Sequence, residues 1–528
     1  MTKFIIVTGS VISGLGKGTC SSSIGMILKA YGLKVTSIKI DPYFNVDSGS
    51  MSPWQHGECY VLNDGTESDL DLGNYERFLN VELSGCHSIT SGKIYKDVID
   101  KERRGDYLGA TVQMVPHITD YIQQQIIKAS KEIVEDGNKE NDVCIIELGG
   151  SIGDMEGLVF CEAIAQFTRN ILNENDSCFV HLSYVPTIHE NEFKTKPTQQ
   201  SMRTVRSLGI FPDFLILRSE KDMKDEDIKK VSRMCQIRQE NIIRNPNTKR
   251  IYDVPQILMQ QELHFKIARK LGLHEKVDQT IIPNLQSYQR IQNHYNVVAN
   301  NNVNIGIVGK YTGSQDTYLS IIRSLEMACV IKNRKLNIKW INSEIKPDEM
   351  DQLIDKCDSI IIPGGFGDRG IEGMIHAVYK CRKHGKRLLG ICLGFQVMCI
   401  EFARNVLNFE RANSVEFDKN TPFPIIVPVA SEDILGGTMR LGKRDINIEQ
   451  NIFDLYDTNV ISKRFRHRYG LNMNHLYFSH FNSHPDFNIF GKTIDGIISN
   501  ITIGNAVGVQ YHPEFGPKTD ETFLWLIN

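Results

Sequence analysis

The chain has 528 residues, which is long for a single hydrophobic core, so we expect two or more domains. Charged residues make up 23% of the sequence and hydrophobic residues 41%, the balance of an ordinary globular protein, and the net charge of −3 gives no electrostatic reason to expect nucleic acid as a partner. The twelve cysteines form no Cys-x-x-Cys pair, and we see neither a secretory signal nor an apolar run of 18 residues. We therefore expect a cytoplasmic protein with reduced thiols and no membrane span.

The first predicted element is an apolar strand, residues 4–7, which runs into a glycine-rich segment and then a helical pattern. A strand, a glycine-rich loop with a lysine, and a helix are the arrangement that cradles phosphates. The loop is not a strict P-loop, because six residues separate Gly9 from Gly16 and Gly18 follows Lys17. A flexible strand–helix turn is the alternative, but a lysine between two glycines at a helix start argues for phosphate binding.

Later segments of the first half supply acids and bases. Asp69 and Asp71 are paired in the segment at 68–78, and an apolar strand at 143–146 ends in Glu147. A carboxylate at a strand end beside a phosphate loop suits Mg²⁺, which is bound by few carboxylates together with phosphate oxygens. Residues 194–199 form a compact cationic loop, which by itself would be solvated surface but near a triphosphate would act as a clamp.

Apolar strands alternate with helical patterns in both halves, which predicts an α/β protein with parallel sheets. The first predicted domain spans residues 1–273. A linker follows at 274–302 and ends in a polar asparagine tract. A new strand at 304–308 opens the second domain, which spans 303–528.

Cys392 is the most informative residue of the second half. An apolar strand runs into Gly390-Ile391-Cys392-Leu393-Gly394, and a helical pattern follows, which is the layout of a nucleophile elbow with sulfur in place of oxygen. We expect the glycines to permit a sharp turn and to let neighbouring strands approach. The turn would leave the thiol exposed beside the amides of a helix N-terminus, which favour a thiolate and can hold an oxyanion. The alternative is a buried structural cysteine.

Two other segments support the catalytic interpretation. In an extended segment residues two apart point the same way, so His512 and Glu514 can lie on one face. His512 can take the thiol proton, while Glu514 orients the imidazole. Gly364 and Gly365 follow an apolar strand at 359–362 and can aim a backbone N–H at a developing oxyanion. Together these three segments closely resemble the class I glutamine amidotransferases, which hydrolyse glutamine through a thioester on a Cys-His-Glu triad.

The strings DLDLGNYERF, KTKPTQ, GICLG and QYHPEF occur in this order along the chain. In sequence and order they resemble signatures of the CTP synthase family, and the resemblance runs from about Met1 to Phe515. The resemblance implies a synthetase (amidoligase) domain with a P-loop-like parallel sheet, followed by a glutamine amidotransferase domain. It also implies a ligase of pyrimidine nucleotide biosynthesis, in which ATP phosphorylates the 4-oxygen of UTP and ammonia from glutamine displaces the phosphate to give CTP.

The resemblance also assigns site residues. For ATP it implies Gly14, Leu15, Gly16, Lys17, Gly18, Thr19, Lys39 and Asp71, and for Mg²⁺ Asp71 and Glu147. For UTP and inhibitory CTP it implies Ser13, Asp154, Met155, Glu156, Lys194, Thr195, Lys196, Pro197, Thr198, Gln199 and Lys230. For glutamine it implies Gly364, Gly365, Leu393, Gly394, Phe395, Gln396, Glu416 and Arg468. The family is activated by GTP, and residues 436–442 with Lys310 are our candidates for that coupling.

The resemblance implies an internal passage for ammonia and assembly as a homodimer or homotetramer, with filaments as a further form. On this interpretation Pro53, His56 and Cys59 line a gate, although His56 could also be an ordinary core histidine. Two other functions stay open at this point. One is a different amidotransferase fused to an ATP-dependent ligase, such as a cofactor amidase. The other is a filament-forming protein with vestigial sites, against which the intact Cys392 and Lys17 argue.

Overall fold

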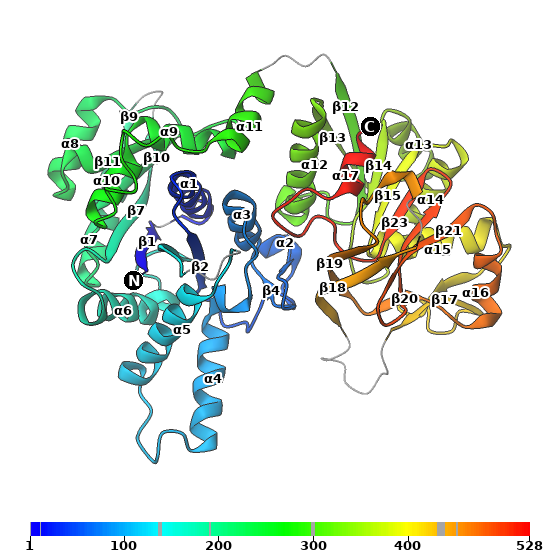
Figure 1. Ribbon diagram of the computed structural model, residues 1–528, viewed down its shortest axis with the longest axis horizontal. Coiled ribbons are helices and arrows are strands. Elements are labelled where there is room, and N and C mark those ends of the chain that lie inside the picture. Colours follow the sequence, from blue (N-terminus) through cyan, green and yellow to red (C-terminus); the bar gives the residue numbers. More distant parts are fainter. Residues whose placement is uncertain are drawn as a thin grey trace. The chain divides into compact units, whose positions relative to one another are not determined.

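The computed structural model describes residues 2–10, 12–135, 140–188, 192–296, 301–429, 439–449 and 452–528. They form two compact units (Figure 1). The first unit combines Met1–Ser50 with Asp71–Gln292, and the second combines Met51–Leu70 with Asn293–Asn528. The second unit therefore contains a short segment from early in the chain. None of the helices in the described ranges has both the length and the apolar composition needed to cross a bilayer.

The first unit is built on a seven-stranded sheet in which every pairing is parallel. In spatial order the strands are β11 (Ile242–Pro246), β10 (Phe214–Ser219), β7 (Ser177–Val185), β1 (Lys3–Gly9), β6 (Val143–Leu148), β2 (Val35–Asp41) and β5 (Ser88–Thr90). The central strands are continuous apolar runs, as expected for a sheet that is buried on both faces. The predicted α/β fold is confirmed.

Helices cover both faces of this sheet. The core on one face joins alternate strand residues to α4 (Ser91–Arg104), α5 (Thr119–Lys131), α6 (Leu158–Gln166), α7 (Lys196–Ser207) and α8 (Asp225–Cys235). On the other face lies α1 (Lys17–Ala30), where a side chain at Gly25 would collide with Ile145 of β6. Helix α1 packs in turn against α9 (Val254–Gln260). This layering places the start of α1 at the carboxyl end of β1.

The second unit is built on a mixed nine-stranded sheet. Its parallel part runs β13 (Lys335–Asn342), β12 (Asn302–Gly309), β14 (Ser359–Ile362), β15 (Arg387–Ile391) and β23 (Ala506–Val509), and its antiparallel part continues with β22 (Ile498–Ile503), β21 (Phe487–Thr493), β18 (Arg440–Ile448) and β19 (Val460–His467). Helices α13 (Pro347–Asp355), α14 (Ile371–Lys383) and α15 (Leu393–Asn405) share one core with one face. Helices α12 (Leu319–Lys332) and α17 (Glu521–Leu526) share a core with the other.

Polar contacts fix the segment 51–70 within the second unit. Both carboxylate oxygens of Glu58 accept hydrogen bonds from the backbone N–H of Ser320 at 3.0 Å. The guanidinium of Arg464 donates to the side chain of Asn63 at 2.7 Å and to the Tyr60 hydroxyl at 3.2 Å, and that hydroxyl accepts from the N–H of Gly516 at 2.8 Å. The short hairpin of β3 (Tyr60–Val61) and β4 (Glu67–Ser68) is therefore held against β19 and the C-terminal segment.

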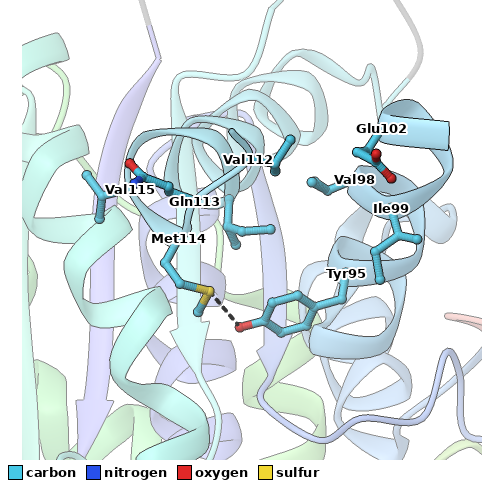
Figure 2. A pocket seen from close by; sticks show the side chains of 9 residues that line it. Tyr95, Val98, Ile99, Glu102, Val112, Gln113, Met114 and Val115 are labelled. Atoms are coloured by element: carbon cyan, nitrogen blue, oxygen red, sulfur yellow. Dashed lines mark hydrogen bonds between the residues drawn. The ribbon is translucent and has the colours of Figure 1, made fainter. Parts of the chain in front are cut away.

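An apolar pocket of about 640 Å³ opens beside α4 in the first unit. Figure 2 shows the pocket between α4 and the segment at 112–118, where the Tyr95 hydroxyl donates to the sulfur of Met114 at 3.7 Å. Ile99, Met114 and Val115 are 57%, 49% and 47% exposed, so large apolar side chains are left facing solvent at one place. Such a patch is typical of a contact surface.

Candidate functional site

Three neighbouring parallel strands of the second unit bring the predicted triad together. Strands β14, β15 and β23 are adjacent, with Ile362 opposite Gly390 and Ile391 opposite Val509. Because their carboxyl ends lie at the same edge of the sheet, the residues that follow them meet there. A side chain added at Gly364 would lie 2.8 Å from Cε1 of His512 and 3.7 Å from Cβ of Cys392. The three segments singled out from the sequence therefore converge on one point.

The turn at Cys392 is strained at the nucleophile itself. Cys392 has φ 51° and ψ −97°, and α15 begins at the next residue. The flanking glycines serve close packing rather than the turn: a side chain at Gly394 would lie 2.2 Å from the Ile362 carbonyl oxygen. The expected close approach of neighbouring strands at the glycines is thus confirmed, whereas the unusual backbone conformation of the turn lies at Cys392 itself. A strained conformation of this kind costs about 1–3 kcal/mol and is typical of active sites.

The thiol lies in a buried polar environment. Cys392 is only 4% exposed, so the expectation of an exposed thiol is wrong. Its Sγ donates to the carbonyl oxygen of Arg466 at 3.4 Å, and the sulfur also acts electrostatically on the His512 ring. On its other side the His512 Nδ1 lies 2.8 Å from Oε1 of Glu514. Cys392, His512 and Glu514 thus lie together, with the histidine hydrogen bonded to the glutamate.

The charges around His512 favour the protonated form of its imidazole ring. Burial alone would lower the pKa of His512, but the Glu514 carboxylate and the Cys392 sulfur outweigh it and raise the pKa to about 10. A ring with this proton affinity is suited to taking the thiol proton and holding it while sulfur acts as a nucleophile.

Several residues predicted to bind glutamine lie next to Cys392 or contact the loop after β14. Leu393, Gly394, Phe395 and Gln396 form the first turn of α15, and the amide of Gln396 donates to the carbonyl of Tyr469 at 3.0 Å. Glu416 accepts from the N–H of Gly367 at 3.0 Å. Burial raises the pKa of Glu416, and the positive charges of Lys310 and Arg468 partly oppose that shift. An acid and a base therefore flank the loop that begins at Gly364 and Gly365.

Arg466 is a residue of this site that sequence reasoning missed. Its carbonyl receives the Cys392 thiol, while its guanidinium donates to Oε1 of Glu67 at 2.7 Å and lies over the Phe366 ring at 4.9 Å. Cys59, a predicted gate residue, donates to the same Oε1 at 3.7 Å. Arg466 and Glu67 are 399 residues apart, so no local spacing could have signalled this pair.

In the first unit, a lysine joins the two predicted metal ligands. The ammonium of Lys39 forms ion pairs with Asp71 and with Glu147, the latter at 2.9 Å. Tyr75, which the sequence analysis did not single out, donates to the other oxygen of Glu147. Burial opposes the charge on Lys39, but its carboxylate neighbours raise its pKa well above the ordinary value. The two carboxylates are thus held side by side on a buried cation.

The glycine-rich loop packs tightly against this cluster. Lys17 donates to the carbonyl of Gly150 at 2.7 Å, and burial lowers its pKa. A side chain at Gly18 would lie 2.4 Å from Oδ1 of Asp71, so glycine is required there for the loop and the carboxylate to approach. Arg218, a further missed residue, donates to the Leu15 carbonyl at 3.3 Å. The remaining predicted ATP-site residues, Gly14, Gly16 and Thr19, belong to the same loop and to the start of α1.

The donor set of this cluster fits Mg²⁺. Among the described residues, no group of three or more His, Cys, Asp or Glu side chains is arranged to hold a metal. Two carboxylates with hard oxygen atoms are, however, what Mg²⁺ uses when phosphate oxygens and water supply the rest of its shell. Asp71 and Glu147 are such a pair, because both contact the ammonium of Lys39.

The predicted UTP segment begins a helix rather than forming a loop. Pro197 stands at the start of α7, a favoured place because its missing N–H is not needed there. Thr195 and Thr198 are buried, whereas Lys196 is exposed and Lys194 pairs with Glu192. The other predicted members lie apart from α7 in the chain: Ser13 in the glycine-rich loop, Asp154, Met155 and Glu156 on the exposed loop after β6, and Lys230 exposed on α8.

Part of the predicted GTP-coupling segment, residues 436–438, lies outside the described residues. Lys310 donates to the carbonyl oxygens of Phe366, at 3.1 Å, and Gly367. Burial lowers the pKa of Lys310 to about 8. Lys310 thus braces the loop after β14, next to the triad.

Comparison with known proteins identifies relatives of both halves. A family model of the CTP synthase N-terminus matches residues 3–273, and one of class I glutamine amidotransferases matches residues 314–525. The CTP synthase of Dictyostelium discoideum is 42% identical over 565 residues, covering 100% of this chain and 98% of the relative. That of Hydrogenobaculum sp. is 44% identical over 528 residues, covering 98% and 95%. A solved Trypanosoma brucei CTPS glutaminase domain with bound acivicin is 30% identical, covers 42% of this chain and 91% of its own, and has a TM-score of 0.39.

The charge state of His512 gives a direct prediction. In Glu514→Gln the carboxylate that favours the imidazolium is gone, so the pKa of His512 should fall from about 10 toward or below the ordinary value near 6.5. Because the folded-state pKa is raised, the imidazolium stabilises the wild-type fold fully below about pH 6.5, and this contribution is lost as the pH rises toward 10.

NMR of histidine labelled with ¹³C at Cε1 measures this pKa, and the His512→Gln spectrum assigns the signal among the fifteen histidines. Glu344→Gln, which removes an exposed carboxylate elsewhere in the unit, is the control and should leave the titration unchanged. An unaltered His512 titration in Glu514→Gln would contradict the assigned pairing.

Proposed function

The chain belongs to the CTP synthase family, and from this membership we propose how its own residues perform the family's reaction. That reaction is the ATP-dependent amination of UTP to CTP in pyrimidine nucleotide biosynthesis, with ammonia from glutamine hydrolysis. The observation that carries the proposal is the convergence of Cys392 and His512 beside Gly364, with the His512 ring hydrogen bonded to Glu514 at 2.8 Å. Matches along the whole chain favour this reaction over that of another amidotransferase fused to a different ligase.

We propose that Cys392 attacks the side-chain amide carbonyl of glutamine. His512 takes the thiol proton and then gives a proton to the leaving ammonia, while Glu514 holds the ring. Backbone N–H groups of Gly365 and Leu393 are suited to receive the oxyanion, because they lie on the two loops that flank the thiol. Water then hydrolyses the thioester to glutamate, with His512 as the base. The strained conformation at Cys392 supports a catalytic role for this residue.

The glutamine backbone needs one acidic and one basic partner. We propose that Glu416 holds the α-ammonium group and Arg468 the α-carboxylate, since opposite charges suit these two substrate groups. The loop of Gly364 and Gly365 and the first turn of α15, residues 393–396, then form the walls around the side-chain amide. The contact of Glu416 with the N–H of Gly367 supports this, because it fixes the acid beside that loop.

In the first unit, Lys17 and Lys39 counter the charge that moves when the terminal phosphoryl group of ATP passes to the 4-oxygen of UTP. The glycine-rich loop from Gly14 to Thr19 supplies N–H groups to the phosphates. Asp71 and Glu147 would hold Mg²⁺, which neutralises phosphate charge. The close fit of Gly18 against Asp71 supports a shared site, because it brings the phosphate loop and the metal ligands together.

The residues proposed to bind UTP are chosen because their chemistry matches the parts of that nucleotide. Cationic and hydroxyl groups at 194–199, with Ser13 and Lys230, suit a triphosphate, and Asp154, Met155 and Glu156 suit the sugar and base edges. Inhibitory CTP would share the triphosphate part of this site. These residues remain predictions, as do the domain limits of 1–273 and 303–528 with a linker at 274–302.

Regulation and assembly are further proposals. GTP would act near Lys310, which braces the loop beside the triad. The apolar pocket at α4 supports self-association as a homodimer or homotetramer, because it leaves large apolar side chains exposed. Filaments of such assemblies and a cytoplasmic location remain expectations.

For ammonia transfer we propose that Pro53, His56 and Cys59 line the passage. The contact of Cys59 with Glu67 connects that segment to Arg466, because Arg466 donates to the same carboxylate.

The two half-reactions should be separable by mutation. Cys392→Ala removes the nucleophile, so glutamine-dependent CTP formation should fall by several orders of magnitude, while ammonia-dependent formation stays within about twofold of wild type. Cys399→Ala, which truncates a buried cysteine seven residues along the same helix, is the control and should retain both activities. Loss of the ammonia reaction in folded Cys392→Ala would contradict the two-site proposal.

The phosphate loop and metal ligands give a second prediction. Lys17→Ala should reduce CTP formation from either nitrogen source by about a hundredfold or more, and Asp71→Asn should raise the Mg²⁺ concentration required, because an amide is a poorer ligand for a hard cation. Lys29→Ala, at the far end of α1, is the matched control. Glutamine hydrolysis measured alongside separates a lost synthetase site from misfolding. Wild-type rates in both Lys17→Ala and Asp71→Asn would overturn this assignment.

A further inference from the structure

A buried histidine joins the strand of the phosphate loop to the helix of the proposed UTP segment. His181 lies on β7, with its Nδ1 2.8 Å from the hydroxyl of Thr8 on β1 and its Nε2 2.7 Å from the hydroxyl of Ser201 on α7. Thr8, His181 and Ser201 are 2%, 0% and 1% exposed, so water cannot replace these bonds. Thr8 and His181 are register partners of the adjacent parallel strands β1 and β7.

A second pair of contacts runs beside the first. The hydroxyl of Ser183, two residues along β7, donates to the hydroxyl of Thr198 on α7 at 2.9 Å. The N–H of Tyr184 donates at 3.4 Å to the side chain of Ser10, which directly follows β1 ahead of the phosphate loop. Strand β7 therefore carries polar links on one side to the end of β1, which leads into the phosphate loop, and on the other to the first turns of α7.

The chemistry of the ring makes the link through His181 directional. Burial, assisted by the charge of Lys17, lowers the pKa of His181 to about 3, so the ring is neutral at physiological pH. A neutral imidazole has one N–H donor and one acceptor nitrogen, so one hydroxyl must donate to the ring while the other accepts from it. An apolar residue at 181 would leave two buried hydroxyls without this partner.

We propose that His181 is a positioning residue for phosphoryl transfer, which holds the phosphate loop and α7 at a fixed separation. The proposal rests on the proposed function, because the phosphate loop serves ATP and α7 carries the proposed UTP residues Lys196 and Thr198. Transfer from ATP to the 4-oxygen of UTP needs the two nucleotides aligned, and a misplacement of about 1 Å can cost a hundredfold in rate. Because His181 is fully buried, it acts through Thr8 and Ser201 rather than by direct contact with a nucleotide.

Isosteric substitutions can break one link at a time. In His181→Asn the side-chain amide lies near the position of Nδ1, so the bond to Thr8 can be kept while the bond to Ser201 is lost. In His181→Gln the amide lies near the position of Nε2, so the bond to Ser201 can be kept while the bond to Thr8 is lost. Each should lower kcat/KM for UTP in ammonia-dependent synthesis by about 10- to 100-fold, and His181→Ala by at least as much as the worse of the two.

A double-mutant cycle distinguishes positioning from simple loss of stability. Thr8→Val and Ser201→Ala remove the two outer hydroxyls, and because both break the same link, their combination should be no more than about twofold worse than the worse single variant. His264→Asn is the matched control: it changes another buried, neutral histidine of the same unit, so it should lower the melting temperature while leaving kcat/KM for UTP within about twofold of wild type.

Multiplicative losses in the cycle, or unchanged kcat/KM in both Thr8→Val and Ser201→Ala, would overturn the inference while the proposed function stands. The inference would also be overturned if kcat/KM for UTP fell only in proportion to the melting temperature, so that His264→Asn lowered kcat/KM as much as His181→Asn. Failure of the wild-type chain to form CTP from ammonia, ATP and UTP would instead overturn the proposed function, and the inference with it.

Discussion

Adjacent parallel strands end at the same edge of a sheet, and both candidate sites of this chain depend on that constraint. In the second unit, the ends of β14, β15 and β23 bring Gly364, Cys392 and His512 to one point, although 148 positions separate the first from the last. In the first unit, β1 leads into the glycine-rich loop, while β6 and β2 supply Glu147 and Lys39 as register partners.

The chain as a whole carries a net charge of only −3, so the charge at each site comes from neighbouring side chains rather than from the overall charge of the protein. Lys39 is buried between two carboxylates, which keep it charged and which it holds together. His512 is kept charged in the same way by Glu514 and Cys392. In each case burial alone would discharge the cation, and a specific anionic neighbour reverses that effect. A buried ion pair is costly to assemble, so its presence at both strand edges is more readily explained by chemistry than by stability.

Much of both sites could be predicted because their residues are close in sequence or follow recognisable strands. The phosphate loop, the elbow at Cys392 and the pairing of His512 with Glu514 all have local signatures. Arg466 and Glu67 could not be predicted, since their ion pair spans nearly the whole chain and depends on residues 51–70 joining the second unit. The unusual backbone conformation at Cys392 agrees with the nucleophile elbow, in which the nucleophile itself occupies the strained turn. Proline is favoured at the first position of a helix, so Pro197 indicates that α7 starts here and that the segment is not a loop.

The most direct test of the account follows the nitrogen atom. The wild-type chain is incubated with UTP, ATP, Mg²⁺, GTP and glutamine labelled with ¹⁵N at its side-chain amide, and CTP, glutamate and ADP are measured by mass spectrometry. The account predicts CTP labelled at its exocyclic amine, with one glutamate and one ADP formed for each CTP. Glutamate without CTP, or CTP that carries no label, would contradict it.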